Sequence, residues 1–356
     1  MRIRNSATTA TLASWNAAWS GVKVAVFGVS ERGFAAADTL AELGAEVLVL
    51  APEPGGERER LLAVIGATFK QLQSTEIAPQ LAAFAPQLIV VADSEQPGAT
   101  EVLRAAQNSQ VPVWSDIELA WHVGDKFGVA AQWICVSGQQ DVAATVELTA
   151  RMLLAAGRRV APVGLSAPPV LDAVRDPARF EFFVVGLSGA DLRLLDGIHP
   201  VASALLSVDA AAGAGGSAGA EDSTGVTSAA PATELEPYGN VYTNTKLACI
   251  YNRHSLATEK LLAAADVAEG CRAVSFGLDT PPLAGLGLVE DVLADRGYHA
   301  ERRNSALELA TLSELASRNL ATPQDVANFL AAAALARACE VSPAAIAAAL
   351  TQLPEV

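Results

Sequence analysis

The stretch from Trp133 to Leu154 reads WICVSGQQDVAATVELTARMLL and predicts a strand, a glycine-containing turn and a helix in succession. The apolar run Trp133–Val136 has the length of a buried strand. From Val142 onward, apolar residues recur at helical spacing, as at Val146 and Leu153. This order is the geometry of a phosphate-binding loop, in which backbone N–H groups and a helix N-terminus face an anion.

The turn nevertheless lacks the side chains that phosphate chemistry uses. In a phosphate-binding loop, a lysine reaches the terminal phosphates and a following hydroxyl holds Mg²⁺. Here the corresponding residues are Asp141, Val142 and Ala143. The sequence therefore predicts the backbone of a nucleotide site without its reactive groups.

Composition excludes several classes of protein. The chain has 356 residues, long enough for two domains, and a hydrophobic fraction of 51% supplies the cores. The formal net charge is −15, and the 24 Lys and Arg form no basic cluster. Nucleic acid and anionic membrane surfaces are therefore poor candidate partners.

The cysteines and the N-terminus indicate the compartment. Cys135, Cys249, Cys271 and Cys339 are scattered with no C-x-x-C pair, which disfavours a zinc site and favours a reducing cytoplasm. No apolar segment typical of a signal peptide follows Met1, and no apolar run reaches the roughly 18 residues of a membrane span. We expect a soluble cytoplasmic protein without metal ligands.

The first 128 residues predict a lead-in, residues 1–20, and a Rossmann-like domain, residues 21–128. Strand Lys23–Phe27, a turn from Gly28 to Gly33, helix Phe34–Leu43 and strand Glu46–Leu50 form a βαβ unit. Further strands alternate with helices, which favours a parallel, doubly wound sheet.

A second α/β domain is expected from residue 129 to residue 356. Residues 209–233 interrupt it with small residues, no aromatic side chain and no periodicity, which predicts a flexible insertion. A strand is also expected at Leu288–Leu293, and proline-initiated helices at Pro323–Ala338 and Pro343–Leu350.

Segments along nearly the whole chain resemble the Mur ligase family, and most closely the type that joins D-glutamate to UDP-N-acetylmuramoyl-L-alanine. Besides the opening stretch, the segments that carry the resemblance are Val24–Val47, Val111–Trp121, Ala155–Gly164, Val241–Asn252, Val267–Phe276 and Val326–Ala338. The resemblance implies a UDP-binding Rossmann-like domain, a central ATP-binding domain and a C-terminal domain that closes over the site. It also implies a reaction with ATP and Mg²⁺ that phosphorylates the substrate carboxylate before D-glutamate attacks.

The chain departs from the family pattern where that chemistry takes place. The family loop T-G-T-N-G-K-T-T-T is here Ser137-Gly138-Gln139-Gln140-Asp141-Val142-Ala143-Ala144-Thr145, so that Val142 takes the lysine position. The family E-L-S-S motif is Gly186–Gly189, the metal-binding histidine falls within residues 209–233, and the carbamylated lysine falls at about Tyr238. Of the adenine-side H-N-x-x-N motif only Asn328 remains, and Val356 stands where the third domain is expected to begin.

Two binding remnants have a structural alternative. Gly28, Val29, Ser30, Arg32 and Gly33 are candidates for holding a UDP-sugar, with Arg32 pairing with the pyrophosphate, or they form only a corner of the fold. The turn from Ser137 to Ala143 is likewise a residual ATP site or only a structural corner. NAD is disfavoured, because the strand ending at Leu50 has no acidic residue for the ribose.

The sequence therefore predicts an impaired relative of these ligases, related to peptidoglycan precursor synthesis, that still binds UDP-N-acetylmuramoyl-L-alanine or a related UDP-sugar. The alternative is an active ligase whose third domain is missing from this chain or supplied by a protein partner. A third alternative is a decaying gene product with no ligand.

Overall fold

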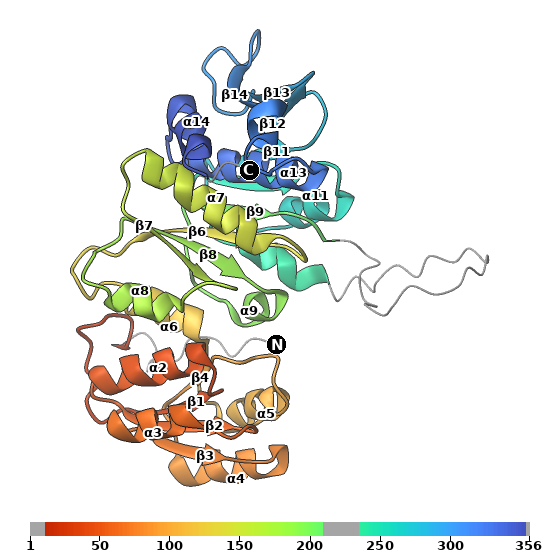
Figure 1. Ribbon diagram of the computed structural model, residues 1–356. Coiled ribbons are helices and arrows are strands. Elements are labelled where there is room, and N and C mark those ends of the chain that lie inside the picture. The colour runs from red at the N-terminus through yellow and green to blue at the C-terminus, as the bar shows by residue number, and fades with distance from the viewer. Residues whose placement is uncertain (1–10, 209–234, 354–356) are drawn as a thin grey trace, which may run out of the picture. The chain divides into compact units, whose positions relative to one another are not determined.

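The computed structural model describes residues 11–208 and 235–353 (Figure 1). The insertion predicted at residues 209–233 and the first ten residues of the lead-in lie outside the described residues. The chain folds into two compact units. Of the described residues, the first comprises 11–131, 168–180 and 194–198, and the second comprises 132–167, 181–193, 199–208 and 235–353. The predicted boundary at residue 128 stays a prediction.

The first unit is built on a five-stranded parallel sheet with the order β3-β2-β1-β4-β5. Its strands are β1 (Lys23–Phe27), β2 (Glu46–Ala51), β3 (Thr68–Gln71), β4 (Leu88–Val91) and β5 (Val113–Ser115). Its helices are α2 (Glu31–Glu42), α3 (Glu57–Val64), α4 (Ser74–Phe84), α5 (Ala99–Ser109), α6 (Asp116–His122) and α8 (Val170–Arg175).

Alternating apolar residues give this sheet two buried faces. Ala25 and Phe27 of β1 join one core cluster with residues of α4 and α5, while Val24 and Val26 point to the opposite face. The helix α8 packs against α2 and α6, although it comes from much later in the sequence. Arg175 of α8 donates to the carboxylates of Asp38 and Glu42 at 2.5 and 2.9 Å, respectively.

The second unit is built on a nine-stranded sheet with the order β14-β13-β12-β11-β10-β9-β6-β8-β7. All neighbouring strands from β12 to β7 in this order pair in parallel. Strand β13 pairs antiparallel with both of its neighbours, β12 and β14. The strands are β6 (Gln132–Ser137), β7 (Val160–Gly164), β8 (Phe182–Leu187), β9 (Ala202–Leu205), β10 (Ala248–Asn252), β11 (Arg272–Phe276), β12 (Gly285–Val289), β13 (Val292–Asp295) and β14 (Leu307–Thr311).

Three helices cover one face of this sheet: α7 (Val142–Ala155), α13 (Pro323–Ala338) and α14 (Pro343–Thr351). The central helix α13 begins with a capping box between Thr322 and Asp325 and fully buries the small residues Ala331, Ala332, Ala333, Ala334 and Ala336. The remaining helical elements of this unit are α9 (Gly189–Leu194), η1 (Glu236–Tyr242), α11 (Leu256–Ala263) and α12 (Leu312–Ala316).

The α/β class and the parallel-sheet N-terminal unit are confirmed, and so is the succession of strand, turn and helix at Trp133–Leu154. The single strand predicted at Leu288–Leu293 is wrong. The chain reverses there at Glu290, whose φ is +56°, and the segment belongs to the hairpin of β12 and β13. Among the described residues, no helix has the length and apolar character that crossing a membrane requires.

Candidate functional site

The turn between β1 and α2 is closed so tightly that two of its residues must be glycine. Gly28 has φ +111°, and a Cβ added there would lie 2.2 Å from Oδ2 of Asp93. A Cβ on Gly33 would lie 2.3 Å from the carbonyl oxygen of Gly28. The predicted residues Gly28 to Gly33 therefore form one compact corner at the carboxyl end of β1.

A carboxylate from a distant segment occupies the N-terminus of α2. Asp93 accepts hydrogen bonds from the backbone N of Ser30 at 3.1 Å and from its Oγ at 2.5 Å. The Oγ of Ser30 in turn accepts from the backbone N of Gly33 and caps the helix. Asp93 thus contributes a negative charge where a helix N-terminus would otherwise attract an anion.

Asp93 was not among the residues predicted from the sequence, although its position carried a signal. Asp93 follows β4, and the strand order reverses between β1 and β4. Residues that follow neighbouring parallel strands meet at such a switch point, which is where doubly wound sheets bind ligands. Asp93 and the turn at Gly28 are therefore brought together by topology.

Arg32, expected to face a pyrophosphate, instead pairs with Asp116 at the start of α6. Its Nε and Nη2 donate to the two carboxylate oxygens at 2.8 and 2.6 Å. The Asp116 side chain is only 2% exposed, so this bidentate pair is nearly desolvated. The geometry gives Arg32 a structural partner within its own unit.

The same short helix ends at His122, which lies 4.3 Å from Trp114 in a stacked arrangement of the two rings. Burial lowers the pKa of His122 to about 4, so the imidazole is neutral at pH 7. Its Nε2 is 3.9 Å from a carboxylate oxygen of Glu118, but this contact is no ion pair while the ring is neutral. Trp19 from the lead-in packs edge-on against Trp114.

In the second unit, the turn from Ser137 to Ala143 keeps the backbone of a phosphate-binding corner. The Oγ of Ser137 donates to the carbonyl oxygen of Leu187 at 2.8 Å, and the backbone N of Gln139 donates to Ser207 at 3.0 Å. Gly138 is buried against Leu206. Asp141 has φ +58° and precedes the first residue of α7 without a side-chain capping bond.

The exposed side chains of this turn are not those that phosphate chemistry uses. Gln139, Gln140, Asp141 and Ala143 are exposed at the N-terminus of α7, whose first N–H groups have no partner within the helix. The exposed set holds one acidic and no basic side chain. Mg²⁺-ATP therefore does not fit the turn as it stands, since neither a cation nor a hydroxyl replaces the residues of the family loop.

The side chain of Val142 points into the core rather than toward the turn. It is 4% exposed, and its Cγ1 would lie 3.3 Å from a Cβ added at Gly186 of β8. A second contact would be the carbonyl oxygen of Leu165, also at 3.3 Å. The positions that match the family lysine and the family glutamate are thus adjacent, and Val142 fills the space between them.

The residue at the position of the carbamylated lysine lies near the same strand end. The ring of Tyr238 packs over Gly189, where an added Cβ would lie 2.9 Å from its Cζ. Ser188 and Asp191 beside it exchange hydrogen bonds of 2.8 to 3.1 Å that close the first turn of α9. The three positions at which the resemblance places the family's phosphate and metal residues therefore lie around the carboxyl ends of β6 and β8.

Asn328, the adenine-side remnant, is on α13 and is 3% exposed. Its Oδ1 accepts a hydrogen bond from Nε2 of Gln324 at 3.1 Å. The contact joins two residues one helical turn apart, so the amide has a local structural partner.

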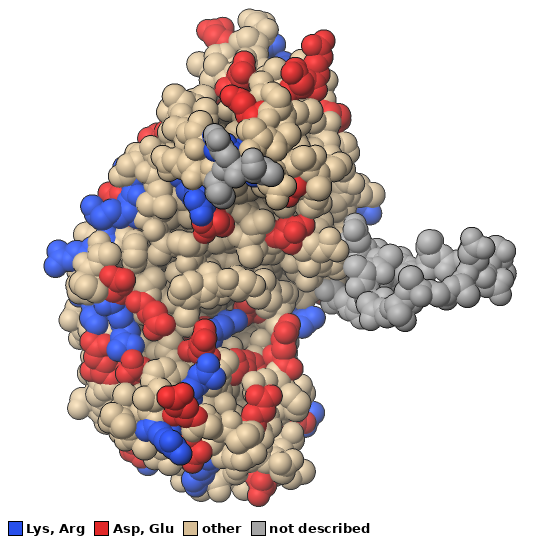
Figure 2. Space-filling model, in the orientation of Figure 1, with Lys and Arg blue, Asp and Glu red and all other residues tan. Residues whose placement is uncertain are grey.

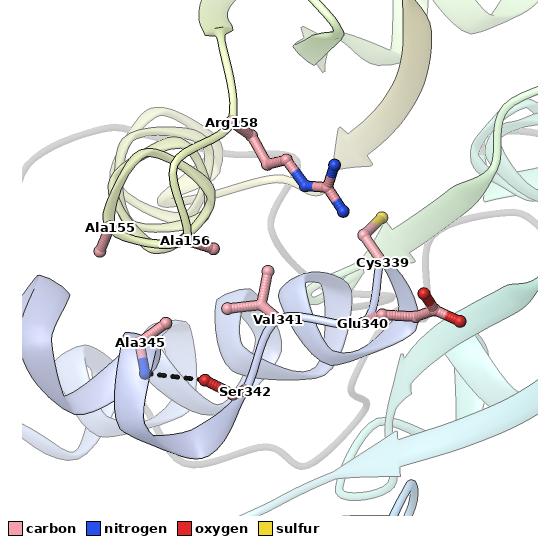
Figure 3. Close-up of a pocket in the computed structure, with 8 residues that line it drawn as sticks. All are labelled: Ala155, Ala156, Arg158, Cys339, Glu340, Val341, Ser342 and Ala345. Atoms are coloured by element: carbon pink, nitrogen blue, oxygen red, sulfur yellow. Dashed lines mark hydrogen bonds between the residues drawn. The ribbon is translucent and has the colours of Figure 1, made fainter.

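An open pocket of about 340 Å³ lies elsewhere in the second unit, at the C-terminal end of α7 (Figure 3). It is lined by Ala155, Ala156, Arg158, Cys339, Glu340, Val341, Ser342 and Ala345. The turn from Ser137 to Ala143 lies at the N-terminus of α7, whereas this pocket lies at the C-terminal end of the same helix. The pocket is therefore separate from the nucleotide-like corner.

The charged side chains on the face drawn in Figure 2 are of both signs, with basic and acidic side chains interspersed. Residues 11–208 and 235–353 contain no group of three or more His, Cys, Asp or Glu side chains placed to hold a metal ion.

Comparison with known proteins gives a consistent set of relatives. The chain is 44% identical over 351 residues to the UDP-N-acetylmuramoylalanine–D-glutamate ligase of Leifsonia xyli subsp. xyli, covering 94% of this chain and 64% of that protein. The enzyme of the same name from Tropheryma whipplei is 35% identical over 356 residues, covering 96% of this chain and 68% of its own. The chain thus spans about two thirds of the length of these relatives. No family model matches it.

Solved structures agree on the fold. The UDP-N-acetylmuramate:L-alanyl-gamma-D-glutamyl-meso-diaminopimelate ligase of Neisseria meningitides aligns with a TM-score of 0.56 and 16% identity, covering 95% of this chain and 99% of that one. The murein peptide ligase of Psychrobacter arcticus 273-4 aligns with a TM-score of 0.53 and 14% identity, covering 94% and 69%.

Proposed function

Because this chain belongs to the Mur ligase family, within the group of UDP-N-acetylmuramoylalanine–D-glutamate ligases, we propose that it is an impaired member. It acts in the cytoplasm, in peptidoglycan precursor synthesis, by binding a UDP-sugar rather than by ATP-dependent addition of D-glutamate. The geometry of the two corners and the substitutions at them support this proposal.

The observation that carries the proposal is the packing of Val142 against Gly186. These positions match the lysine and the glutamate that the family uses around the transferred phosphate. Here one holds an apolar side chain that is 4% exposed and the other holds no side chain. Loss of a single electrostatic stabiliser commonly costs roughly 10²- to 10³-fold in rate, so loss of both leaves little activity.

The contact restricts reversion at position 186, and burial restricts reversion at position 142. A glutamate at position 186 would bring its Cβ to 3.3 Å from Val142, which is closer than ordinary packing. A lysine at position 142 would have to leave the core to keep its ammonium hydrated. The two substitutions support each other structurally.

Binding of a UDP-sugar at the first corner is supported by its backbone and opposed by its charge. The turn from Gly28 to Gly33 places the N-terminus of α2 at the carboxyl end of β1, which is suited to a diphosphate. Asp93 accepts hydrogen bonds from both the N and the Oγ of Ser30. A bound diphosphate has to displace this carboxylate, so the proposal includes weak binding that Asp93→Ala strengthens.

The first test measures ligation with the full chain. Purified protein is mixed with UDP-N-acetylmuramoyl-L-alanine, D-glutamate and Mg²⁺-ATP, and ADP release is followed. We expect release no faster than in the absence of D-glutamate. Release that requires both substrates would overturn the proposal.

The second test is calorimetric titration with UDP-N-acetylmuramoyl-L-alanine in the absence of ATP. The proposal predicts saturable binding with a lower Kd for Asp93→Ala than for the unaltered chain. No heat with either protein would show that the glycine turn is only a corner of the fold.

The third test restores the second corner. The triple variant Asp141→Gly, Val142→Lys and Ala143→Thr is titrated with ATP, with the double variant Asp141→Gly and Ala144→Lys as the control. This control makes the same change in charge on the exposed first turn of α7, but its lysine lies away from the lysine position. Binding by the triple variant alone identifies a silenced nucleotide site, and binding by neither identifies a structural corner.

A second candidate is an active ligase whose third domain is missing from this chain or supplied by a protein partner. It is consistent with the relatives, which are named UDP-N-acetylmuramoylalanine–D-glutamate ligases. Adding the isolated C-terminal domain of such a relative to the ligation assay separates the candidates. Substrate-dependent ADP release in the mixture supports the second, and its absence supports the first.

A further inference from the structure

Two of the four cysteines lie in contact on neighbouring strands of the second unit. The Sγ atoms of Cys249, in β10, and Cys271, just before β11, are 3.6 Å apart. Both are free thiols. Since β10 and β11 pair in parallel, with Cys249 opposite Ala273, the two cysteines lie diagonally across the strand pair.

The two thiols differ in exposure and acidity. Cys271 is partly exposed, and a hydrogen bond from Cys249 to its sulfur is the main reason that its pKa is lowered. Cys249 is buried, and its pKa is raised by the interaction with Cys271 and by burial. A partly exposed thiol of lowered pKa in contact with a second thiol is the arrangement of reactive cysteine pairs.

A small polar network surrounds the buried member. The Oγ of Ser203 is 3.7 Å from Sγ of Cys249 and 2.8 Å from Oγ1 of Thr245. These hydroxyls contribute hydrogen bonds that lower the pKa of Cys249 and oppose the effect of burial. The network therefore stabilises negative charge on Cys249 as its proton leaves.

We propose that Cys249 and Cys271 form a peroxide-oxidisable pair that closes to an intramolecular disulfide. The thiolate of Cys271 attacks one oxygen of hydrogen peroxide, the O–O bond breaks, and a sulfenic acid and hydroxide form. The sulfur of Cys249 then attacks the sulfur of Cys271, the S–O bond breaks, and a second hydroxide leaves. The two thiol protons convert both hydroxides to water, so two thiols are oxidised by two electrons and one peroxide is reduced.

The geometry requires only a small movement. A disulfide has an S–S distance of about 2.05 Å, so closure shortens the present separation by roughly 1.5 Å, shared between two side chains. Cys271 lies in the turn before β11, where its backbone N donates to the carbonyl oxygen of Ala268 at 3.0 Å. Rotation of its side chain therefore leaves the strand ladder intact.

The other two cysteines supply internal controls. Cys135 in β6 and Cys339 after α13 are buried, and burial raises the pKa of each to about 12. Both thiols are therefore protonated at neutral pH. Peroxide oxidation should therefore consume two thiols of the four.

The experiment treats the full chain with hydrogen peroxide near pH 7 and counts thiols after denaturation. We expect a fall from four to two, a mass loss of about 2 Da and one crosslinked peptide pair containing Cys249 and Cys271. Dithiothreitol should restore all four thiols. Cys271→Ser should abolish this reaction, whereas Cys135→Ser should retain the crosslink.

Retention of four thiols would overturn the proposal. So would oxidation of Cys271 to a sulfinic or sulfonic acid without the crosslink, because the pair would then lack the resolving step. A crosslink that involves Cys135 or Cys339 would equally contradict it. None of these readouts depends on ligation or on a bound UDP-sugar, so the inference stands apart from the proposed function.

Discussion

The chain contains two strand–turn–helix corners of similar form, and they are stabilised in opposite ways. At the first, from Gly28 to Gly33, side chains from distant segments supply charge and hydrogen bonds, namely Asp93 to Ser30 and Asp116 to Arg32. At the second, from Ser137 to Ala143, an apolar side chain, Val142, is anchored in the core beneath an exposed turn. At the first corner, charged side chains of the protein pair with the polar groups of the turn. At the second corner, the Oγ of Ser137 and the backbone N of Gln139 donate to backbone carbonyl oxygens and not to charged side chains.

This difference shows how a binding corner can lose its ligand chemistry while the fold persists. A carboxylate can take the place of a bound anion at a helix N-terminus because both accept from the same donors. A valine can take the place of a lysine because the strand and helix still bury an apolar contact. Four predictions test the contrast, from the largest expected effect to the smallest.

The largest effect is expected from removing the charged partner at the first corner. Arg32→Ala leaves the carboxylate of Asp116, 2% exposed, without its bidentate donor. Breaking a buried ion pair in this way typically costs about 3 to 5 kcal/mol of stability. Urea denaturation followed by circular dichroism measures the change.

The matched control removes an arginine from the helix of the second corner. Arg151 pairs with Glu147 one turn away on α7, and both side chains are substantially exposed. Arg151→Ala should cost no more than about 0.5 kcal/mol. Equal losses for the two variants would contradict the contrast.

The glycines of the two corners should differ next. A Cβ at Gly33 would meet the backbone oxygen of Gly28 at 2.3 Å, which neither helix nor turn can relieve. A Cβ at Gly138 would meet its nearest atom, the Cβ of Leu206, at 3.1 Å. We expect Gly33→Ala to cost about 2 to 3 kcal/mol and Gly138→Ala less than about 1 kcal/mol. The midpoints of urea denaturation measure both losses, provided that the slope of free energy against urea concentration is unchanged. A larger loss of stability for Gly138→Ala than for Gly33→Ala would contradict the prediction.

Burial of His122 at the end of α6 should make the stability of the first unit depend on pH. The pKa of His122 is about 4 in the folded protein and about 6.5 when unfolded. Between these values the unfolded chain binds the additional proton. The contribution is therefore fully present above pH 6.5 and is lost as the pH falls toward 4.

After allowance for partial solvent exposure, this loss should reach about 2 kcal/mol. His122→Phe keeps a ring against Trp114 and removes the titrating group, so its unfolding free energy should fall less between pH 6.5 and 4. Comparing the two proteins over this range cancels the carboxylates that they share. Parallel pH profiles would show that His122 does not contribute.

The smallest pair of effects concerns the residues that precede the two helices. Ser30→Ala removes the cap of α2 and a hydrogen bond to Asp93, which should cost about 1 kcal/mol. Asp141 has φ +58° and no capping bond, so Asp141→Gly should stabilise by roughly 0.5 kcal/mol. Thermal unfolding should therefore move in opposite directions for the two variants.

The secondary-structure elements that could be predicted from the sequence are those with a clear local pattern of apolar residues. Periodicity alone located β1, β2, β6 and α7, because each element repeats apolar residues at its own spacing. It merged β12 and β13 into one strand, because the turn at Glu290 carries neither glycine nor proline. It did not identify β3, which has one half-buried residue among exposed ones and therefore no alternation.

The site divides in the same way. The sequence by itself determined the fold class, the two glycine-containing turns and the substitution of Val142 for a lysine, since these are local patterns or residue identities. Only the tertiary structure decided that Asp93 occupies the first turn, that Arg32 pairs with Asp116, and that Val142 packs against Gly186. Each of these contacts joins segments more than 40 residues apart in sequence. Such contacts depend on strand order and register, which apolar periodicity does not encode.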